Sequence, residues 1–188
     1  MTTAGQRPMR ADARRNYKRL LTEAKRAFLE HGAEVPLEDI ARSAGVGIGT
    51  LYRHFPTRLA LQEAVYHEEV DELCTKAYEL VESESGGEAL PAWMRSFTTY
   101  ATNKRGLMQT MKEVIDRRSD LFSRCHDEIQ EAAGAVLAAA KDAGTVRPEV
   151  SVSDLLRLTH GLSVATQHVP EDADRLLSYL LDGLRPQG

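Results

Sequence analysis

Apolar residues recur at steps of three and four along almost the whole chain, and no stretch alternates apolar and polar residues with a period of two. Steps of three and four place side chains on one face of an α-helix, whereas a half-buried strand requires alternation. Glycines, prolines and short polar loops divide the pattern into about nine segments of helical length. The sequence therefore predicts an all-α fold of about nine helices.

Three of these helices are expected near the N-terminus. The first covers about residues 12–31 and stops at Gly32, a residue that accepts the left-handed backbone of a helix end. The second and third cover about residues 36–44 and 47–54, with Gly45 in the turn between them. Two short helices joined by a glycine-containing turn form a helix-turn-helix.

Six helices are expected in the rest of the chain. Residues 103–106 are predicted to separate the fifth helix from the sixth, which carries Val114 and Ile115. Ser151 and Asp154 have the spacing of a capping box and mark the start of the eighth helix. The ninth helix is rich in leucine.

Charge is divided unevenly between the two parts. Residues 1–58 hold eleven Lys and Arg against six Asp and Glu, a net charge of +5, and the whole chain has −4, so residues 59–188 carry −9. A basic N-terminal part on an acidic remainder indicates that a polyanion would be met by the N-terminal part. We expect two domains, residues 1–58 and 59–188.

Several classes of protein are not expected. Cys74 and Cys125, the two cysteines, lie among apolar residues at helical spacing, which predicts neither a disulfide framework nor a cysteine zinc site. The first ten residues have no apolar core of a signal peptide, and no stretch approaches the roughly 18 apolar residues of a membrane span. We expect a cytoplasmic protein without a metal, a cofactor or a membrane partner.

An enzyme is not expected either. The sequence has no glycine-rich phosphate loop, no HExxH motif, no paired metal-ligand spacing and no nucleophile elbow. Cys125 and His126 are neighbours and so point in different directions on a helix, which argues against a catalytic or chelating pair.

The most specific stretch covers residues 37–55, LEDIARSAGVGIGTLYRHF, followed by Leu59 and Leu61. It resembles the DNA-binding signature of the TetR family of transcriptional regulators over about 25 residues, in the N-terminal third of the chain. The resemblance implies a three-helix, helix-turn-helix DNA-binding domain followed by a helical domain for ligand binding and dimerisation. It departs from the common pattern at Gly47, where Ser or Thr is frequent, and at Arg58, where Lys is frequent.

Each matched position has an expected role. Buried residues would fix the two short helices against the first: Ile40, Ala41, Ala44, Val46, Leu51 and Phe55. The residues predicted to contact DNA are Arg42, Gly47, Ile48, Gly49, Thr50, Tyr52, Arg53, His54 and Arg58. The resemblance assigns Thr50, Tyr52, His54 and Arg58 to phosphates. Ile48 is a candidate for contact with a thymine methyl, and Arg42 and Arg53 are candidates for contact with base edges or phosphates. The two glycines leave the start of the recognition helix without bulk; alternatively, Gly47 only caps the helix.

Arg7, Arg10, Arg14 and Arg15 precede this motif as a basic arm. Such an arm either follows the DNA backbone or enters a minor groove, or it is simply a solvated tail.

In the second domain, the resemblance implies a small-molecule effector site and a dimer interface. The candidate pocket residues are Trp93, Phe97, Tyr100, Met108, Met111, Phe122, His126 and His160. Plain packing of helices is the alternative for each of the apolar ones, and surface exposure for the histidines.

The last two helices carry more leucines than one buried face uses: Leu155, Leu158, Leu162, Leu176, Leu177, Leu180, Leu181 and Leu184. A two-fold four-helix interface would bury them, so we expect a homodimer through helices eight and nine and a pseudo-palindromic double-stranded operator. The leading hypothesis is a repressor released from DNA by an effector. The alternative is a helical protein-interaction module that does not bind DNA.

Overall fold

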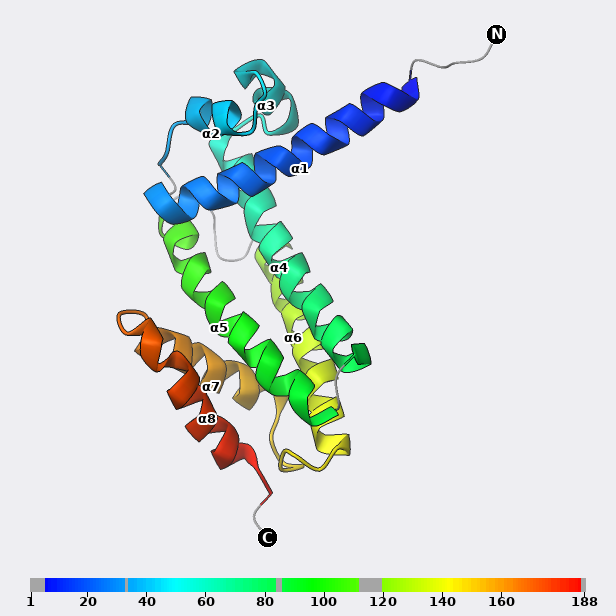
Figure 1. The fold of residues 1–188 in the computed structure, drawn as a ribbon, viewed down its shortest axis with the longest axis vertical. Helices are drawn as coiled ribbons and strands as arrows, with labels where there is room; N and C mark the ends of the chain where they lie inside the picture. Colours follow the sequence, from blue (N-terminus) through cyan, green and yellow to red (C-terminus); the bar gives the residue numbers. More distant parts are fainter. Residues whose placement is uncertain (1–5, 33, 84–85, 112–119, 187–188) are drawn as a thin grey trace. The chain divides into compact units, whose positions relative to one another are not determined.

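The structure is a computed structural model that describes residues 6–32, 34–83, 86–111 and 120–186. Within these ranges the regular structure is helical and no strand occurs, so the predicted all-α class is confirmed (Figure 1). The elements are α1 (Gln6–His31), α2 (Leu37–Ser43), α3 (Ile48–His54), α4 (Arg58–Ser83), α5 (Gly86–Met111), α6 (Asp120–Asp142), α7 (Val152–Ala165), the 3-10 turn η1 (Pro170–Asp172) and α8 (Ala173–Leu184).

The chain forms two compact units that divide within α4, between His67 and Glu68. The first, which we call the head, holds α1, α2, α3 and the beginning of α4, together with the end of α5 from Gly106. The second, the body, holds the rest of α4 and α5 with α6, α7 and α8. Residue 58 remains our predicted boundary between the two functional domains.

In the head, α2 contacts both α1 and α3, and the two short helices lie together on one side of α1 (Figure 1). The buried side of α1 follows the predicted apolar stripe through Leu20, Leu21, Ala24 and Phe28. Gly32 ends α1 with a φ of 82°, in the left-handed region expected of it.

The start of α1 was predicted too late. The helix begins at Gln6, six residues before the expected Asp12, and Pro8 stands in its first turn. Proline is tolerated there because the first N–H groups of a helix have no intrahelical partner to lose. The two short helices, α2 and α3, each begin one residue later than expected, because Pro36 and Gly47 immediately precede them rather than being their first helical residues.

The predicted break at residues 103–106 is wrong, because α5 continues through it to Met111. One glycine in a helix costs only about 1 kcal/mol relative to alanine, and a well-buried helix overrides such a penalty. Trp93, Phe97 and Tyr100 provide that burial on α5. The described residues therefore contain eight α-helices, and the expected sixth-helix residues Val114 and Ile115 lie outside the described ranges.

The body is built around α6 and α7, with α7 in contact with both α6 and α8. Ser151 caps α7 in the predicted capping box: its hydroxyl accepts from the Asp154 N–H at 3.1 Å, and the Asp154 carboxylate accepts from the Ser151 N–H at 3.1 Å. Trp93 on α5 donates its indole N–H to the carbonyl oxygen of Leu73 on α4 at 3.1 Å. None of the described helices has the length and apolar composition needed to cross a membrane.

Candidate nucleic-acid interface

The turn between α2 and α3 depends on Gly45. Its φ of 65° lies in the left-handed region, where a side chain is disfavoured. The Gly45 and Val46 N–H groups close the end of α2 by donating to the carbonyl oxygens of Arg42 and Ala41, each at 3.0 Å. A Cβ at residue 45 would come too close to the Nη2 atom of Arg19 on α1. Arg19 was not singled out from the sequence, since no local pattern links positions so far apart.

Packing beneath α3 fixes its direction. Leu51 and Phe55 are almost fully buried, and the Tyr17 ring of α1 lies 5.1 Å from the Phe55 ring and 5.8 Å from the His54 ring. Five of the six predicted scaffold residues are buried as expected; Val46 is only half-buried, at the turn. The short helix is therefore packed along one side.

The opposite side of α3 is open. Ile48 and Tyr52 are 36% and 46% exposed, and Gly49 and Arg53 are also exposed. Positions 48 and 52, and positions 49 and 53, are four residues apart and therefore neighbours on the helix surface; at about 100° per residue, all four lie within an arc of about 140°. We call these four residues the α3 surface. It offers an apolar side chain, open backbone, a hydroxyl and a guanidinium, which are the groups that contact base edges and phosphates in a groove.

The two recognition-helix glycines differ. Gly47 has an extended backbone (φ −71°, ψ 148°) and caps α3, which matches the alternative that the sequence left open. Gly49 lies inside the helix, where glycine costs up to about 1 kcal/mol relative to alanine. A Cβ at Gly49 would meet nothing within 4 Å, so internal packing gives no reason for a glycine there.

The remaining predicted contacts are less open. Thr50 and His54 are half-buried, and His54 packs against Tyr17. Arg42 is exposed at the end of α2, where it pairs with Asp39 at 2.8 Å.

Arg58 begins α4 and is half-buried. Its Nη1 donates to the carbonyl oxygen of Val35 at 2.7 Å, which ties the start of α4 to the segment between α1 and α2. Part of its hydrogen-bonding capacity thus stabilises the head itself. The sequence suggested only a phosphate contact.

In the body, the structure brings together three of the predicted pocket residues. Trp93, Phe97 and Tyr100 are buried along α5, with ring centroids 5.5 Å apart for the first pair and 5.9 Å for the second. Phe122 is half-buried, while His126 and His160 are exposed rather than enclosed among the aromatic rings. The side chains of Met108 and Met111 lie outside the described part of the chain.

The two thiols are poor nucleophiles in this fold. Burial, reinforced by the nearby Glu128 carboxylate, raises the pKa of Cys74 to about 12 and that of Cys125 to about 11. Both therefore remain protonated near neutral pH.

Comparisons with known families match both parts of the chain. The family described as "Bacterial regulatory proteins, tetR family" matches residues 20–65, which include the C-terminal part of α1, all of α2 and α3, and the start of α4. The family described as "Transcriptional regulator SbtR-like, C-terminal domain" matches residues 85–186.

Solved structures extend the similarity to nearly the whole chain. The TetR transcriptional regulator SCO0520 of Streptomyces coelicolor is 40% identical, with a TM-score of 0.82 over 92% of this chain and 99% of that one. A TetR transcription regulatory protein of Mycobacterium vanbaalenii is 37% identical, with a TM-score of 0.80 over 95% of this chain and 100% of that one.

Among curated proteins, the HTH-type transcriptional regulator SAR0097 of Staphylococcus aureus (strain MRSA252) is 39% identical over 71 residues. This match covers 36% of the present chain and only 37% of the relative. Similarity to that relative is therefore confined to about a third of either protein.

Proposed function

The chain belongs to the TetR family of transcriptional regulators, and from this membership we propose that it binds a specific DNA sequence by inserting α3 into the major groove. The observation that carries the proposal is that α3 is buried on one side against α1 and leaves the α3 surface open on the other. Gly49 supports it, because a glycine that no internal contact requires allows close approach of an outside partner. We accordingly treat the protein as a regulator and not as an enzyme, acting in the cytoplasm where its DNA would lie.

The proposed contacts follow the exposure of the side chains. The Tyr52 hydroxyl and the Arg53 guanidinium would bind phosphates or base edges, and Ile48 would meet a thymine methyl. Arg42, Thr50, His54 and Arg58 are proposed as secondary contacts, since each is half-buried or already has a partner in the head.

We propose a homodimer formed through α7 and α8, the helices that correspond to the predicted eighth and ninth. These two helices contact each other, and Leu158, Val164 and Tyr179 are 43%, 44% and 61% exposed on them. A two-fold four-helix interface would cover these side chains. The two copies of α3 would then meet half-sites of a pseudo-palindromic operator, about one turn of DNA or a multiple of it apart.

The regulation proposed is repression relieved by a small molecule. The buried aromatic group on α5 supports an apolar effector site in the body, because aromatic side chains commonly line such sites. The effector would have to bind the DNA-free state of the dimer more tightly than the DNA-bound state.

The test is DNA binding of the purified protein at several salt concentrations, on its own upstream intergenic DNA and on a random-sequence library. We compare Tyr52→Phe with Tyr78→Phe, because Tyr78 is a body tyrosine of nearly equal exposure, 44%. Loss of a hydrogen bond to a phosphate should weaken binding by about tenfold or more, since such bonds contribute about 1.5–3 kcal/mol. The Tyr78 variant should bind like the wild type.

Absence of selective binding at low salt to every DNA offered would refute the regulator proposal and favour the protein-interaction module. Selective binding with equal affinity for both variants would remove only the Tyr52 contact.

A further inference from the structure

The N-terminal half of α1 projects beyond the packed part of the head. Along residues 11–19 only Asn16 is half-buried, and the others are exposed. Among the described side chains of this segment, Tyr17 contacts the end of α3, where its ring lies against His54 and Phe55. A helix extending past its last packing contact has no evident role in stabilising the head.

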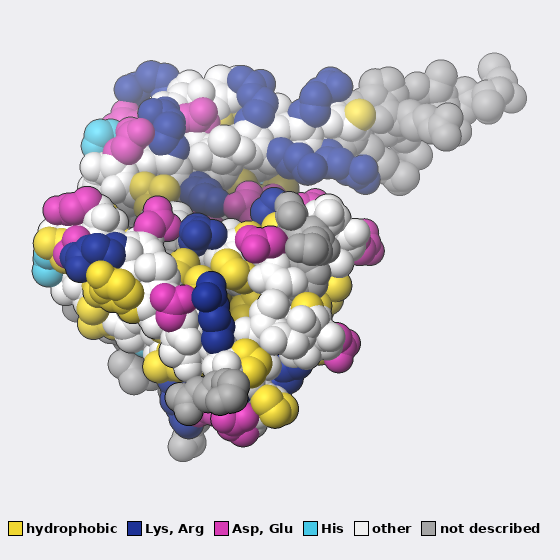
Figure 2. All heavy atoms as spheres, turned by 60° about the horizontal axis from the view of Figure 1, so that its bottom comes forward, with side chains coloured by type: hydrophobic (Ala, Val, Ile, Leu, Met, Phe, Trp, Pro, Cys, Tyr) yellow, Lys and Arg dark blue, Asp and Glu magenta, His cyan; other side chains and the backbone are white. Residues whose placement is uncertain are grey.

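Basic residues dominate this projecting segment. Residues 6–19 hold six Lys and Arg and one acid, Asp12, which pairs with Arg15. Figure 2 shows dark-blue side chains along the visible face of the segment that leads to the grey N-terminal residues.

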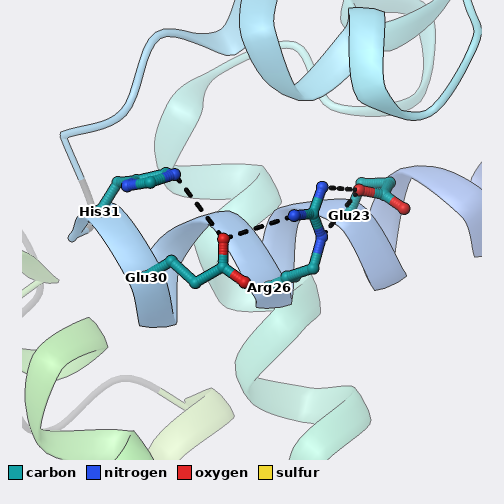
Figure 3. Close-up of polar contacts among 4 residues, drawn as sticks. All are labelled: Glu23, Arg26, Glu30 and His31. Carbon is teal, nitrogen blue, oxygen red and sulfur yellow. Dashed lines mark hydrogen bonds and ion pairs between the residues drawn. The ribbon is translucent and has the colours of Figure 1, made fainter.

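The other half of α1 is different. Arg26 lies between Glu23 and Glu30, at 2.6 and 3.3 Å, and Glu30 also approaches His31 at 3.7 Å (Figure 3). These carboxylates raise the pKa of Arg26 and neutralise its charge locally. Among the described residues, neither Arg14 nor Lys18 has such an ion-pair partner.

Four of the basic positions form a row. Arg7, Arg10, Arg14 and Lys18 follow one another at steps of three, four and four, a spacing that helical periodicity puts in one row along α1. Of these four, the structure describes the side chains of Arg14 and Lys18, and both are exposed. At 1.5 Å per residue the row is about 17 Å long, or about five base pairs of duplex DNA. Its last member is adjacent in sequence to Tyr17, so the row leads away from the C-terminal end of α3.

We propose that this row, the α1 basic stripe, binds phosphates of the duplex that flanks the half-site read by α3. The inference rests on the proposed function and adds to it a contact outside the helix-turn-helix. A helix is about 10–12 Å wide, and the minor groove only about 6 Å, so the stripe follows the outside of the backbone rather than entering that groove. A membrane surface does not fit, because among the described side chains the exposed apolar residues beside the stripe are the small Ala11 and Ala13 and the partly exposed Tyr17, whose ring is turned onto His54 and Phe55.

The test removes two charges of the stripe and varies the flanks of the DNA. The stripe variant is the double substitution Arg14→Gln, Lys18→Gln. Its control is the double substitution Lys76→Gln, Arg185→Gln, which removes two exposed charges from the body. Each protein is titrated against salt on the operator alone and on the operator with about five extra base pairs at each end. On the longer duplex, the slope of log K against log salt should fall by about 0.9 for each phosphate that the variant no longer neutralises, or about 2 per protomer.

On the trimmed duplex the stripe variant and the wild type should have equal slopes, and the control should match the wild type on both duplexes. A charge-conserving Arg14→Lys, Lys18→Arg variant should keep the wild-type slope, which shows that charge rather than helix structure is responsible. If all proteins bind the operator with the same slope on the longer duplex, the stripe proposal is overturned and the α3 proposal stands. If the wild type selects no DNA at all, both fail.

Discussion

Replacing Arg58 by Met separates two roles of this residue. The substitution keeps a long side chain at the start of α4 but removes the Nη1 donor that lies 2.7 Å from the carbonyl oxygen of Val35. Val35 is buried, so its carbonyl would be left without this donor in a region with little access to water. Removal of a hydrogen bond of this kind, half-buried and with a charged donor, should lower the free energy of unfolding by about 1–2 kcal/mol.

For a chain of this length, that decrease corresponds to a fall in Tm of about 2–8 °C. Urea unfolding followed by far-UV circular dichroism measures the free energy, and salt titration of operator binding measures phosphate contacts. If Arg58 mainly stabilises the head, the Met variant unfolds at lower urea while the salt slope per protomer stays that of the wild type. Arg58→Lys should recover part of the stability, because an ammonium can donate to the same carbonyl.

The opposite result would refute this interpretation. An unchanged unfolding free energy, together with a salt slope reduced by about 0.9 per protomer, would identify Arg58 as a phosphate contact, as the family resemblance implies.

Three further outcomes are expected. Gly45→Ala should destabilise the head by about 1–2 kcal/mol because an alanine must adopt the left-handed φ of 65°, and Gly45→Asn should cost less. Equal urea midpoints for the wild type and both variants would contradict a left-handed backbone at residue 45. Trp93→Phe should lower the unfolding free energy by about 1–3 kcal/mol through loss of the 3.1 Å bond to Leu73 and of ring volume, and a neutral effect in urea titration would argue against that bond. With pKa values of about 12 and about 11, Cys74 and Cys125 should be about 1% ionised or less at pH 9. Alkylation of the two thiols, followed by mass spectrometry, should therefore be slow in the native protein, fast in denaturant, and faster as the pH rises toward 11. Rapid labelling of the native protein at pH 9 would count against the burial of these thiols.

Local features of the sequence were sufficient for much of the fold. Apolar spacing identified the helical class, Gly32 and Gly45 marked a helix end and a turn, and the Ser151–Asp154 pair marked the start of α7. Each of these depends on residues within a few positions of one another, whose geometry along the backbone is nearly independent of the rest of the chain. The buried and open positions of α3 were assigned by the resemblance to the TetR signature rather than by spacing alone, and two of the positions predicted to be open, Thr50 and His54, are half-buried.

Helix limits were less predictable. Residues 103–106 have the composition of a break, yet α5 passes through them, because burial of one helix face elsewhere outweighs the local cost of a glycine and an asparagine. The early start of α1 was missed because its first turns have no apolar stripe to reveal them.

By itself, the sequence determined that the chain is helical and which short helix is held on one side and open on the other. Only the tertiary structure decided which side chains meet: Arg58 reaches Val35 across 23 positions, and Arg19 lies over the turn at Gly45. It also put His126 and His160 in solvent and left the aromatic residues of α5 buried. Periodicity fixes the direction of a side chain relative to its own helix, but its partner depends on how distant helices pack, and no spacing within a segment encodes that.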